Sequence, residues 1–184
     1  MDNTTQIYLN IILESGAVEG ESTAGGYERQ IDIDGFEFAA TAKKATLKDV
    51  QKGLEKPNLD MNRVTISKVF DGASLLLANA MQGRKIFSTA TISVDQQYTT
   101  HGRSAKLANQ ILIIELKDGY IADIKLRTSE SGAGAQIKED IELSFHNISI
   151  MYYAEKRKDD TRLLTSDWRD ELWTFATDRK TQEG

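Results

Sequence analysis

The sequence predicts a mainly β protein, a barrel or sandwich of antiparallel strands with one short helix. Three observations support this fold class. Six or seven segments alternate between apolar and polar residues at hairpin spacing. One apolar stretch instead has helical periodicity, at about residues 72–82. The 184-residue chain contains a single proline, Pro57, which leaves long strands uninterrupted.

The N-terminal part of the chain is predicted to contain two strands. Residues 6–13 place four aliphatic side chains on one face: Ile7, Leu9, Ile11 and Leu13. Residues 14–26 form a glycine-rich loop. Residues 27–41 form the second strand, in which Ile31 and Ile33 point inward with Phe36 and Phe38. The phase slips at Asp34 and Gly35, which predicts a bulge.

Residues 42–60 differ from this pattern because they are charged and too polar for a core. Leu47, Val50 and Leu54 have helical spacing and follow a sequence that resembles a capping box. One interpretation is a solvated excursion with a helical turn or two ending before Pro57. The other is an arm in which these three side chains contact a neighbouring subunit.

The change from strand to helix comes at Asp71, which follows the strand beginning at Val64. Asp71 can cap the helix, and Gly83 is expected to end it in a left-handed conformation. A short apolar helix among strands must cover the apolar face of a sheet, so we expect the fold to be organised around it.

The middle of the chain continues in strands. Residues 84–98 alternate through Ile86, Ser88, Ala90, Ile92 and Val94, and a polar loop follows over 99–108. Residues 109–117 are strongly apolar, which predicts a strand covered on both faces. Asp118 and Gly119 then give the best hairpin signal in the sequence.

The C-terminal part begins with the return strand through Ile121, Ile124 and Leu126, and a small-residue turn follows over 129–135. Residues 137–153 are predicted as one long strand, and the charged residues 156–160 as a solvated loop. Trp173 and Phe175 lie two apart, on one face of an edge strand within 168–178.

Composition narrows the classes of function. Forty per cent of the residues are hydrophobic and 28% are charged, as in soluble globular proteins. A net charge of −5 with interleaved signs argues against nucleic acid as a partner. No apolar run is long enough to cross a membrane, and residues 1–6 lack the features of a secretory signal, so we expect no membrane insertion.

Catalytic and metal-binding patterns are missing, so we expect no enzyme activity, no cofactor and no metal. Without cysteine there is no thiol nucleophile or cysteine-ligated metal, and the two histidines, His101 and His146, are interpreted as structural or incidental. The acidic cluster Glu139, Asp140 and Glu142 is interpreted as exposed sheet charge rather than a general-acid pair. The long strands, which proline does not blunt, favour pairing with another chain.

The order and spacing of several short motifs resemble the haemolysin-coregulated protein (Hcp) family. The similar segments are Ile7-Tyr8-Leu9, residues 18–22, 31–33, 36–38, 65–68, Asp71, 74–77, 83–85, 90–92, 114–118, Glu139, 141–145, Tyr152-Tyr153 and 172–180. Two features depart from the family pattern. Residues 42–60 are small and Gly-rich in most members, and Glu37 replaces a residue that is usually small.

The resemblance implies a single Hcp-like β-barrel domain over residues 1–184, made of two packed antiparallel sheets, with an inter-subunit arm at 42–60 and a closing tail segment at 168–180. It further implies the tube subunit of a bacterial type VI secretion system. Six copies would close into a ring, and rings would stack inside a contractile sheath behind spike proteins, with effector proteins in the lumen. The subunit would be made in the cytoplasm and then secreted through the apparatus without a signal peptide.

The resemblance also gives Glu37 a candidate role. If Phe36 and Phe38 face the core, Glu37 faces the other way, and the resemblance places that face on the channel wall, where effectors would pass. The alternative is a glutamate exposed on the outside of the sheet. For the whole chain, the alternatives are a phage-type tail tube subunit without effector transport, or an Hcp-like protein with a short fused effector tail.

Overall fold

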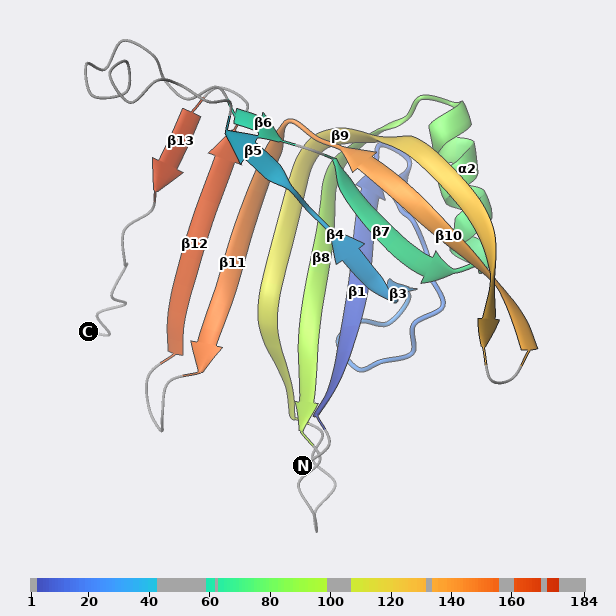
Figure 1. The fold of residues 1–184 in the computed structure, drawn as a ribbon, viewed down its shortest axis with the longest axis horizontal. Coiled ribbons are helices and arrows are strands. Elements are labelled where there is room, and N and C mark those ends of the chain that lie inside the picture. Colours follow the sequence, from blue (N-terminus) through green and yellow to red (C-terminus); the bar gives the residue numbers. More distant parts are fainter. Residues whose placement is uncertain are drawn as a thin grey trace.

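The computed structural model describes residues 3–42, 59–61, 63–98, 107–131, 134–155, 161–169 and 172–175. The strands before the helix are β1 (Asn3–Leu13), β2 (Gly16–Ala17), β3 (Ile31–Ile33), β4 (Gly35–Glu37), β5 (Ala40–Ala42), β6 (Leu59–Met61) and β7 (Val64–Val69). Helix α2 (Gly72–Gln82) is followed by β8 (Ile86–Tyr98), β9 (Leu107–Ser131), β10 (Gly134–Ser144), β11 (Asn147–Glu155), β12 (Thr161–Arg169) and β13 (Leu172–Phe175) (Figure 1).

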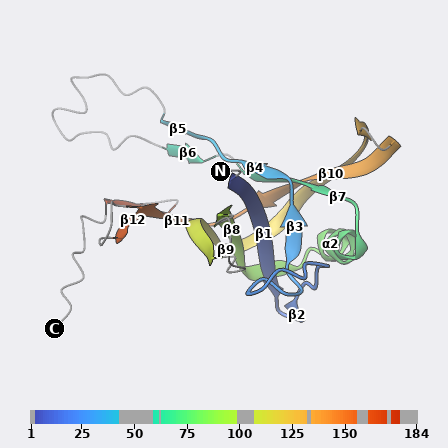
Figure 2. The ribbon, with the colours of Figure 1, turned by 90° about the horizontal axis from the view of Figure 1, so that it is seen from below.

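Strand β9 joins two antiparallel layers because its two halves have different partners. Its N-terminal half pairs with β8 and β11, and its C-terminal half pairs with β10. One layer continues from β8 to β1 and from β11 to β13, and the other runs from β10 through β7 to β4. The second layer and the helix are seen from below in Figure 2. The prediction of a mainly β fold with two antiparallel layers and one helix is confirmed, although no ladder among the described strands closes the sheet into a complete barrel.

The core lies between the layers, where both contribute aliphatic side chains. Its fully buried members include Leu9 and Ile11 of β1, Ile66 of β7 and Ile141 of β10. The predicted inward face of β1 is confirmed, since Leu9, Ile11 and Leu13 are buried and Ile7 packs against the core. These inward faces alternate with polar outward faces, as a sheet with one solvated side requires.

Helix α2 has the predicted bounds, but it ends differently. The side chain of Asp71 accepts a hydrogen bond from the Ser74 N–H, which confirms the N-cap. Gly83 is right-handed (φ −76°), and Arg84 takes the left-handed conformation instead (φ 50°). The Lys85 N–H then bonds Ala80 O at 2.9 Å, so the left-handed residue comes one position later than predicted.

The predicted hairpin at Asp118 and Gly119 is wrong, because β9 runs through both residues. Asp118 has the positive φ (53°) that such a turn uses, but here it bends a continuous strand. Gly119 is needed for a close approach: a Cβ atom there would lie 2.1 Å from Ser144 O and 2.3 Å from the Phe87 ring. The segment through Ile121 is therefore a continuation and not a return strand.

Two other predicted strands are divided where the chain changes layer. Residues 27–41 contain three short strands, and the phase slip at Asp34 marks the passage from β3, on β1, to β4, on β7. Residues 137–153 contain β10 and β11, and their phase changes between Phe145 and Asn147. In β8 the inward phase holds from Ala90 to Val94, whereas Ile86 is exposed and Phe87 is buried.

The C-terminal strands extend the first layer. Strand β12 was not predicted from the sequence, and it pairs with β11 along its whole length. Strand β13 lies at the end of the sheet order, which confirms the predicted edge strand. The predicted loop at 156–160 lies outside the described residues.

Candidate functional site: a buried charge cluster and an outer charged face

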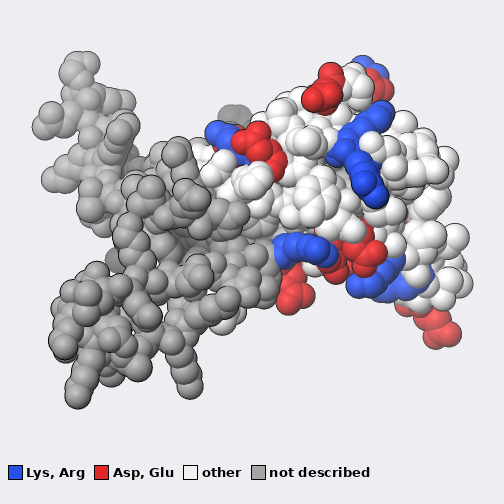
Figure 3. Space-filling model, turned by 90° about the horizontal axis from the view of Figure 1, so that it is seen from above, with Lys and Arg blue, Asp and Glu red and all other residues white. Residues whose placement is uncertain are grey.

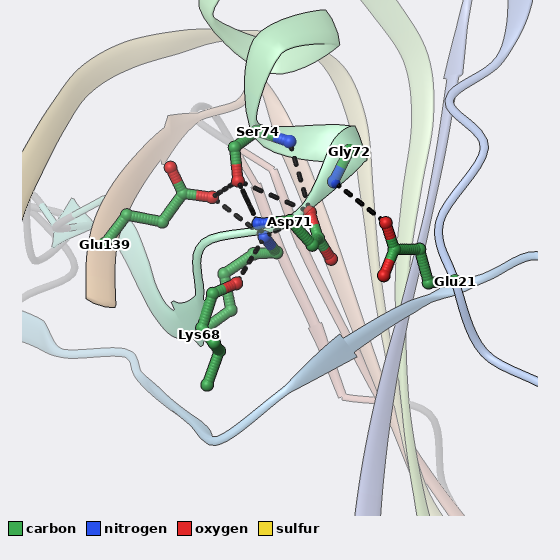
Figure 4. Close-up of polar contacts among 7 residues, drawn as sticks. Glu21, Lys68, Asp71, Gly72, Ser74 and Glu139 are labelled. Carbon is green, nitrogen blue, oxygen red and sulfur yellow. Dashed lines mark hydrogen bonds and ion pairs between the residues drawn. The ribbon is translucent and has the colours of Figure 1, made fainter. Parts of the chain in front are cut away.

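A lysine at the junction of β7, α2 and β10 is completely buried. Lys68 Nζ lies within hydrogen-bond distance of four oxygens, which share its three N–H groups: Asp71 Oδ1 at 2.7 Å, Glu139 Oε1 at 2.9 Å, Ser74 Oγ at 3.0 Å and Val69 O at 2.8 Å (Figure 4). Ser74 Oγ also donates to Glu139 Oε1 at 2.6 Å. Lys68 is 0% exposed and Glu139 is 1% exposed. Four residues, from β7, β10 and the N-terminal end of α2 with its cap, thus form one largely buried network, the Lys68 cluster (Lys68, Asp71, Ser74 and Glu139).

The alternation of the strands puts both charges inside. Lys68 follows Val64 and Ile66 on the inward phase of β7, and Glu139 precedes Ile141 and Leu143 on that of β10. A buried charge is tolerated only when it is paired and hydrogen-bonded, and here each charge has a partner of opposite sign. The cluster therefore ties the N-terminus of α2 to the second layer.

The cluster corrects one sequence interpretation. Glu139 was expected to be exposed sheet charge and is buried, whereas the side chains of Asp140 and Glu142 are 27% and 26% exposed, on the opposite face. The spacing of Glu139 from Ile141 and Leu143 was the signal that could have revealed it. Glu21 adds a contact from outside, since its carboxylate accepts a hydrogen bond from the Gly72 N–H at 3.1 Å.

The outward side of β10, β7 and the C-terminal half of β9 carries paired charges. Each of four cations lies within ion-pair distance of a carboxylate: Arg63 and Glu142 (2.9 Å), Lys125 and Asp123 (3.1 Å), Arg127 and Asp140 (2.9 Å), and Lys138 and Asp34 (2.9 Å). The hydrogen bond from Arg127, followed by one from Ser67 Oγ, lowers the pKa of Asp140. We call this surface the outer charged face.

Glu37 lies on this outer charged face. It is opposite Thr65 in the ladder between β4 and β7, and its side chain is exposed. Phe36 and Phe38 pack against the core, as expected from the alternation. Glu37 lines an open groove of about 480 Å³ with Arg127 and Glu142. Among the described residues it forms no ion pair, so it adds one unpaired negative charge to a face whose other charges are balanced.

The predicted arm residues Leu47, Val50 and Leu54 lie outside the described residues, as do the possible helical turns around them. The ends of residues 42–60 are described in part: Ala42 in β5 pairs with Leu59 in β6, in a two-stranded sheet of its own. His101 also lies outside the described residues, and His146 is exposed, with its backbone N–H donating to the Lys117 carbonyl oxygen at 3.1 Å.

The described residues contain no group of three or more His, Cys, Asp or Glu that could hold a metal ion. None of the described helices has the length and apolar character needed to span a membrane. On the face seen from above, basic and acidic side chains are interleaved over the described surface (Figure 3).

Comparison with known proteins identifies the family. A family model described as "Type VI secretion system effector, Hcp" matches residues 8–152. The chain belongs to the Hcp family. This match confirms the resemblance seen in the sequence. Hcp proteins are structural components of the type VI secretion system. No curated protein matches the sequence.

Solved structures agree with this fold. Hcp1 from Salmonella typhimurium is similar at a TM-score of 0.66 and 17% identity, covering 91% of this chain and 95% of its own. A structure described as a type six secretion system protein is similar at a TM-score of 0.69 and 20% identity, covering 90% of this chain and 96% of its own. The secreted protein Hcp3 from Pseudomonas aeruginosa is similar at a TM-score of 0.59 and 20% identity, covering 90% of this chain and 99% of its own. At these identities the likeness shows the fold alone.

Proposed function

We propose that the chain is the tube subunit of a type VI secretion system, which closes into hexameric rings that stack into an expelled inner tube. The observation that carries this proposal is the Hcp family match over residues 8–152, in a chain with the fold of solved Hcp proteins. The subunit would be made in the cytoplasm, assemble within a contractile sheath behind spike proteins, carry effectors in the lumen, and leave the cell with the tube. Its role would be structural and not catalytic.

The open sheet supports assembly on physical grounds. Strands β13 and β4 lie at the two ends of the sheet order, and neither has a second ladder partner among the described strands, so they are candidate edges for pairing with another chain. Head-to-tail contacts between identical subunits close into a ring when the rotation per subunit divides a full turn. Electron microscopy of the purified protein tests the proposal directly. Six-fold rings are expected, and a field of separate monomers at high protein concentration would contradict it.

The segment at 42–60 is proposed as the arm that reaches a neighbouring subunit or ring. Its ladder between β5 and β6 is separate from the main sheet, which supports a segment that leaves the core. Burying Leu47, Val50 and Leu54 against a neighbour would contribute at most about 1.5–3 kcal/mol each. Deleting Thr46 to Pro57 should therefore leave a folded chain with weakened assembly, measured by circular dichroism and light scattering.

A variant of unchanged length controls for the shortened chain. Leu47→Ser, Val50→Ser and Leu54→Ser combined should weaken assembly as the deletion does, because they remove the same apolar contacts. The arm proposal is wrong if the deletion unfolds the chain, or if both variants assemble like the wild type.

Glu37 is proposed to face the lumen and to favour basic cargo. Six copies in a ring would repeat its unpaired carboxylate around the channel, while the paired charges beside it would contribute little net field. Screening over roughly 8–10 Å at physiological salt leaves such a ring of charge effective at short range. Glu37→Arg should preserve hexamers and reduce co-purification of a cognate effector, whereas Glu14→Arg, at an exposed glutamate just after β1, should leave co-purification unchanged. Loss of hexamers in Glu37→Arg would instead place the residue in a subunit interface.

A further inference from the structure

An open cavity of about 840 Å³ lies on the outward side of the first layer, away from the Lys68 cluster. Strand β1 contributes Tyr8, β3 contributes Asp32 and β8 contributes Asp95, while Tyr27 comes from the segment between β2 and β3. The segment between β2 and β3 folds back over the sheet. It covers the polar side chains of the outward face beside the cavity. Tyr8 and Asp95 are each only 2% exposed.

Two stacked tyrosines form one wall of the cavity. The rings of Tyr8 and Tyr27 are parallel within 8°, with centroids 4.1 Å apart. The Tyr27 hydroxyl donates to Asp95 Oδ1 at 2.9 Å, and the Tyr8 hydroxyl donates to Gln6 Oε1 at 2.6 Å. Since a phenol has a single hydrogen to donate, both hydroxyls use theirs within the protein. Tyr8 is buried behind Tyr27, so the half-buried ring of Tyr27 is the aromatic surface that the wall offers, with hydroxyl groups that can only accept.

The charges at the cavity all have one sign. Its described lining contains three aspartates, Asp32, Asp34 and Asp95, and no lysine or arginine. Lys138 neutralises Asp34 at 2.9 Å, but neither Asp32 nor Asp95 forms an ion pair with any residue that the structure describes. Burial raises the pKa of the Asp95 carboxyl above its ordinary value, opposed by the Tyr27 hydrogen bond. A cation in the cavity would supply the charge that the protein does not.

We propose that this cavity binds a guanidinium group. Guanidinium is planar, so it can stack on a tyrosine ring, and its N–H groups form a fork that matches a carboxylate. A neutral or anionic ligand would leave the excess of acceptors unpaired, and an ammonium would lack the planar match to the ring. The group could belong to a small free molecule or to an arginine side chain of a protein partner, and the chemistry of recognition is the same for both.

Ligand-observed saturation-transfer NMR on the purified protein tests this proposal, whatever its assembly state. The probe is methylguanidinium, and ethylurea is the neutral control of similar shape. Saturable binding is expected for methylguanidinium alone. Asp32→Asn and Asp95→Asn should each weaken it by roughly tenfold, as expected for loss of a charged hydrogen-bond partner. The matched control Asp123→Asn, at an aspartate paired with Lys125 on the other layer, should leave binding unchanged.

One further probe distinguishes a free small molecule from an arginine side chain of a protein partner. An arginine tripeptide capped at both ends should bind more tightly than methylguanidinium if the site takes a side chain, and no more tightly if it takes a free cation. Should Asp95→Asn disturb folding, Asp32→Asn decides, since Asp32 is exposed. The proposal is overturned if methylguanidinium shows no saturable binding, or if Asp32→Asn binds it as well as the wild type. Neither result bears on the tube function, which is tested by assembly alone.

Discussion

Two neighbouring residues of β10 place the same functional group in opposite environments. Glu139 points inward and is 1% exposed, bonded to Lys68 and Ser74 of the Lys68 cluster. Asp140 points outward and is paired with Arg127, which is 45% exposed, on the outer charged face. Both carboxylates have a cation 2.9 Å away. Because the distance between carboxylate and cation is the same in the two pairs, burial is what makes their contributions to stability differ.

This difference has opposite consequences for mutation. Removing one partner of a buried pair leaves a charge that neither water nor protein compensates, which costs about 3–5 kcal/mol. Removing one partner of an exposed pair leaves a charge that water solvates, which costs about 0–1 kcal/mol. The Lys68 cluster thus holds the helix in place, while the outer charged face can change its residues with little effect on folding.

The largest expected effect is that of Glu139→Gln. It keeps the shape of the side chain but removes one of the two carboxylates that compensate the buried Lys68 and leaves Asp71 at 2.7 Å, so the free energy of unfolding should fall by about 3 kcal/mol, the lower end for a broken buried pair. Urea denaturation followed by circular dichroism measures it. The double variant Lys68→Met with Glu139→Leu removes the two fully buried charges and leaves Asp71, whose side chain is 17% exposed, to water and the helix N-terminus, so it should recover much of the loss. If it is as unstable as Glu139→Gln, uncompensated charge is not the cause.

A smaller effect is expected for Ser74→Ala. It removes the hydroxyl that accepts from Lys68 and from the Asp71 N–H and donates to Glu139, so about 1–3 kcal/mol of stability should be lost. Ser67→Ala is the matched control, because Ser67 Oγ donates to Asp140 on the outer charged face at 2.5 Å. Equal losses in the two serine variants would mean that burial does not separate the two faces.

The smallest effect is expected for Asp140→Asn, about 0–1 kcal/mol at neutral pH and less at high salt. Its pKa is lowered below the unfolded value of 3.8, first by Arg127. A lowered folded-state pKa contributes stability that is present above the unfolded pKa and lost as pH falls through the folded one. The difference between wild type and Asp140→Asn should therefore shrink as pH falls below 3.8. A difference that grows in acid would contradict this assignment.

Local features of the fold could be predicted from the sequence. Helix α2 has the predicted bounds because its cap and periodicity lie within a dozen neighbouring residues. The hairpin prediction at Asp118 and Gly119 was wrong because a residue with positive φ followed by a glycine is found in a bent strand as well as in a hairpin turn. Which of the two forms depends on Phe87 and Ser144, which are distant in sequence. The layer changes at Asp34 and after Phe145 did leave a phase slip, but a slip alone does not reveal that the pairing partner changes.

The candidate site was predicted only in part. The outward direction of Glu37 followed from its aromatic neighbours and is confirmed, whereas its place on a channel wall depends on other subunits and stays a proposal. Glu139 was interpreted as a surface charge because its partner Lys68 stands 71 residues away in the sequence. Their partnership follows from the ladder between β7 and β10, which no local pattern specifies.

The mass of the purified protein in solution tests the tube proposal most directly. Light scattering coupled to size exclusion, over a range of protein concentrations, should give six times the chain mass of 20.5 kDa, with larger species if rings stack. The guanidinium cavity and the Lys68 cluster do not enter this measurement. A mass of 20.5 kDa that persists at every concentration would contradict the claim that ring closure is a property of the chain itself.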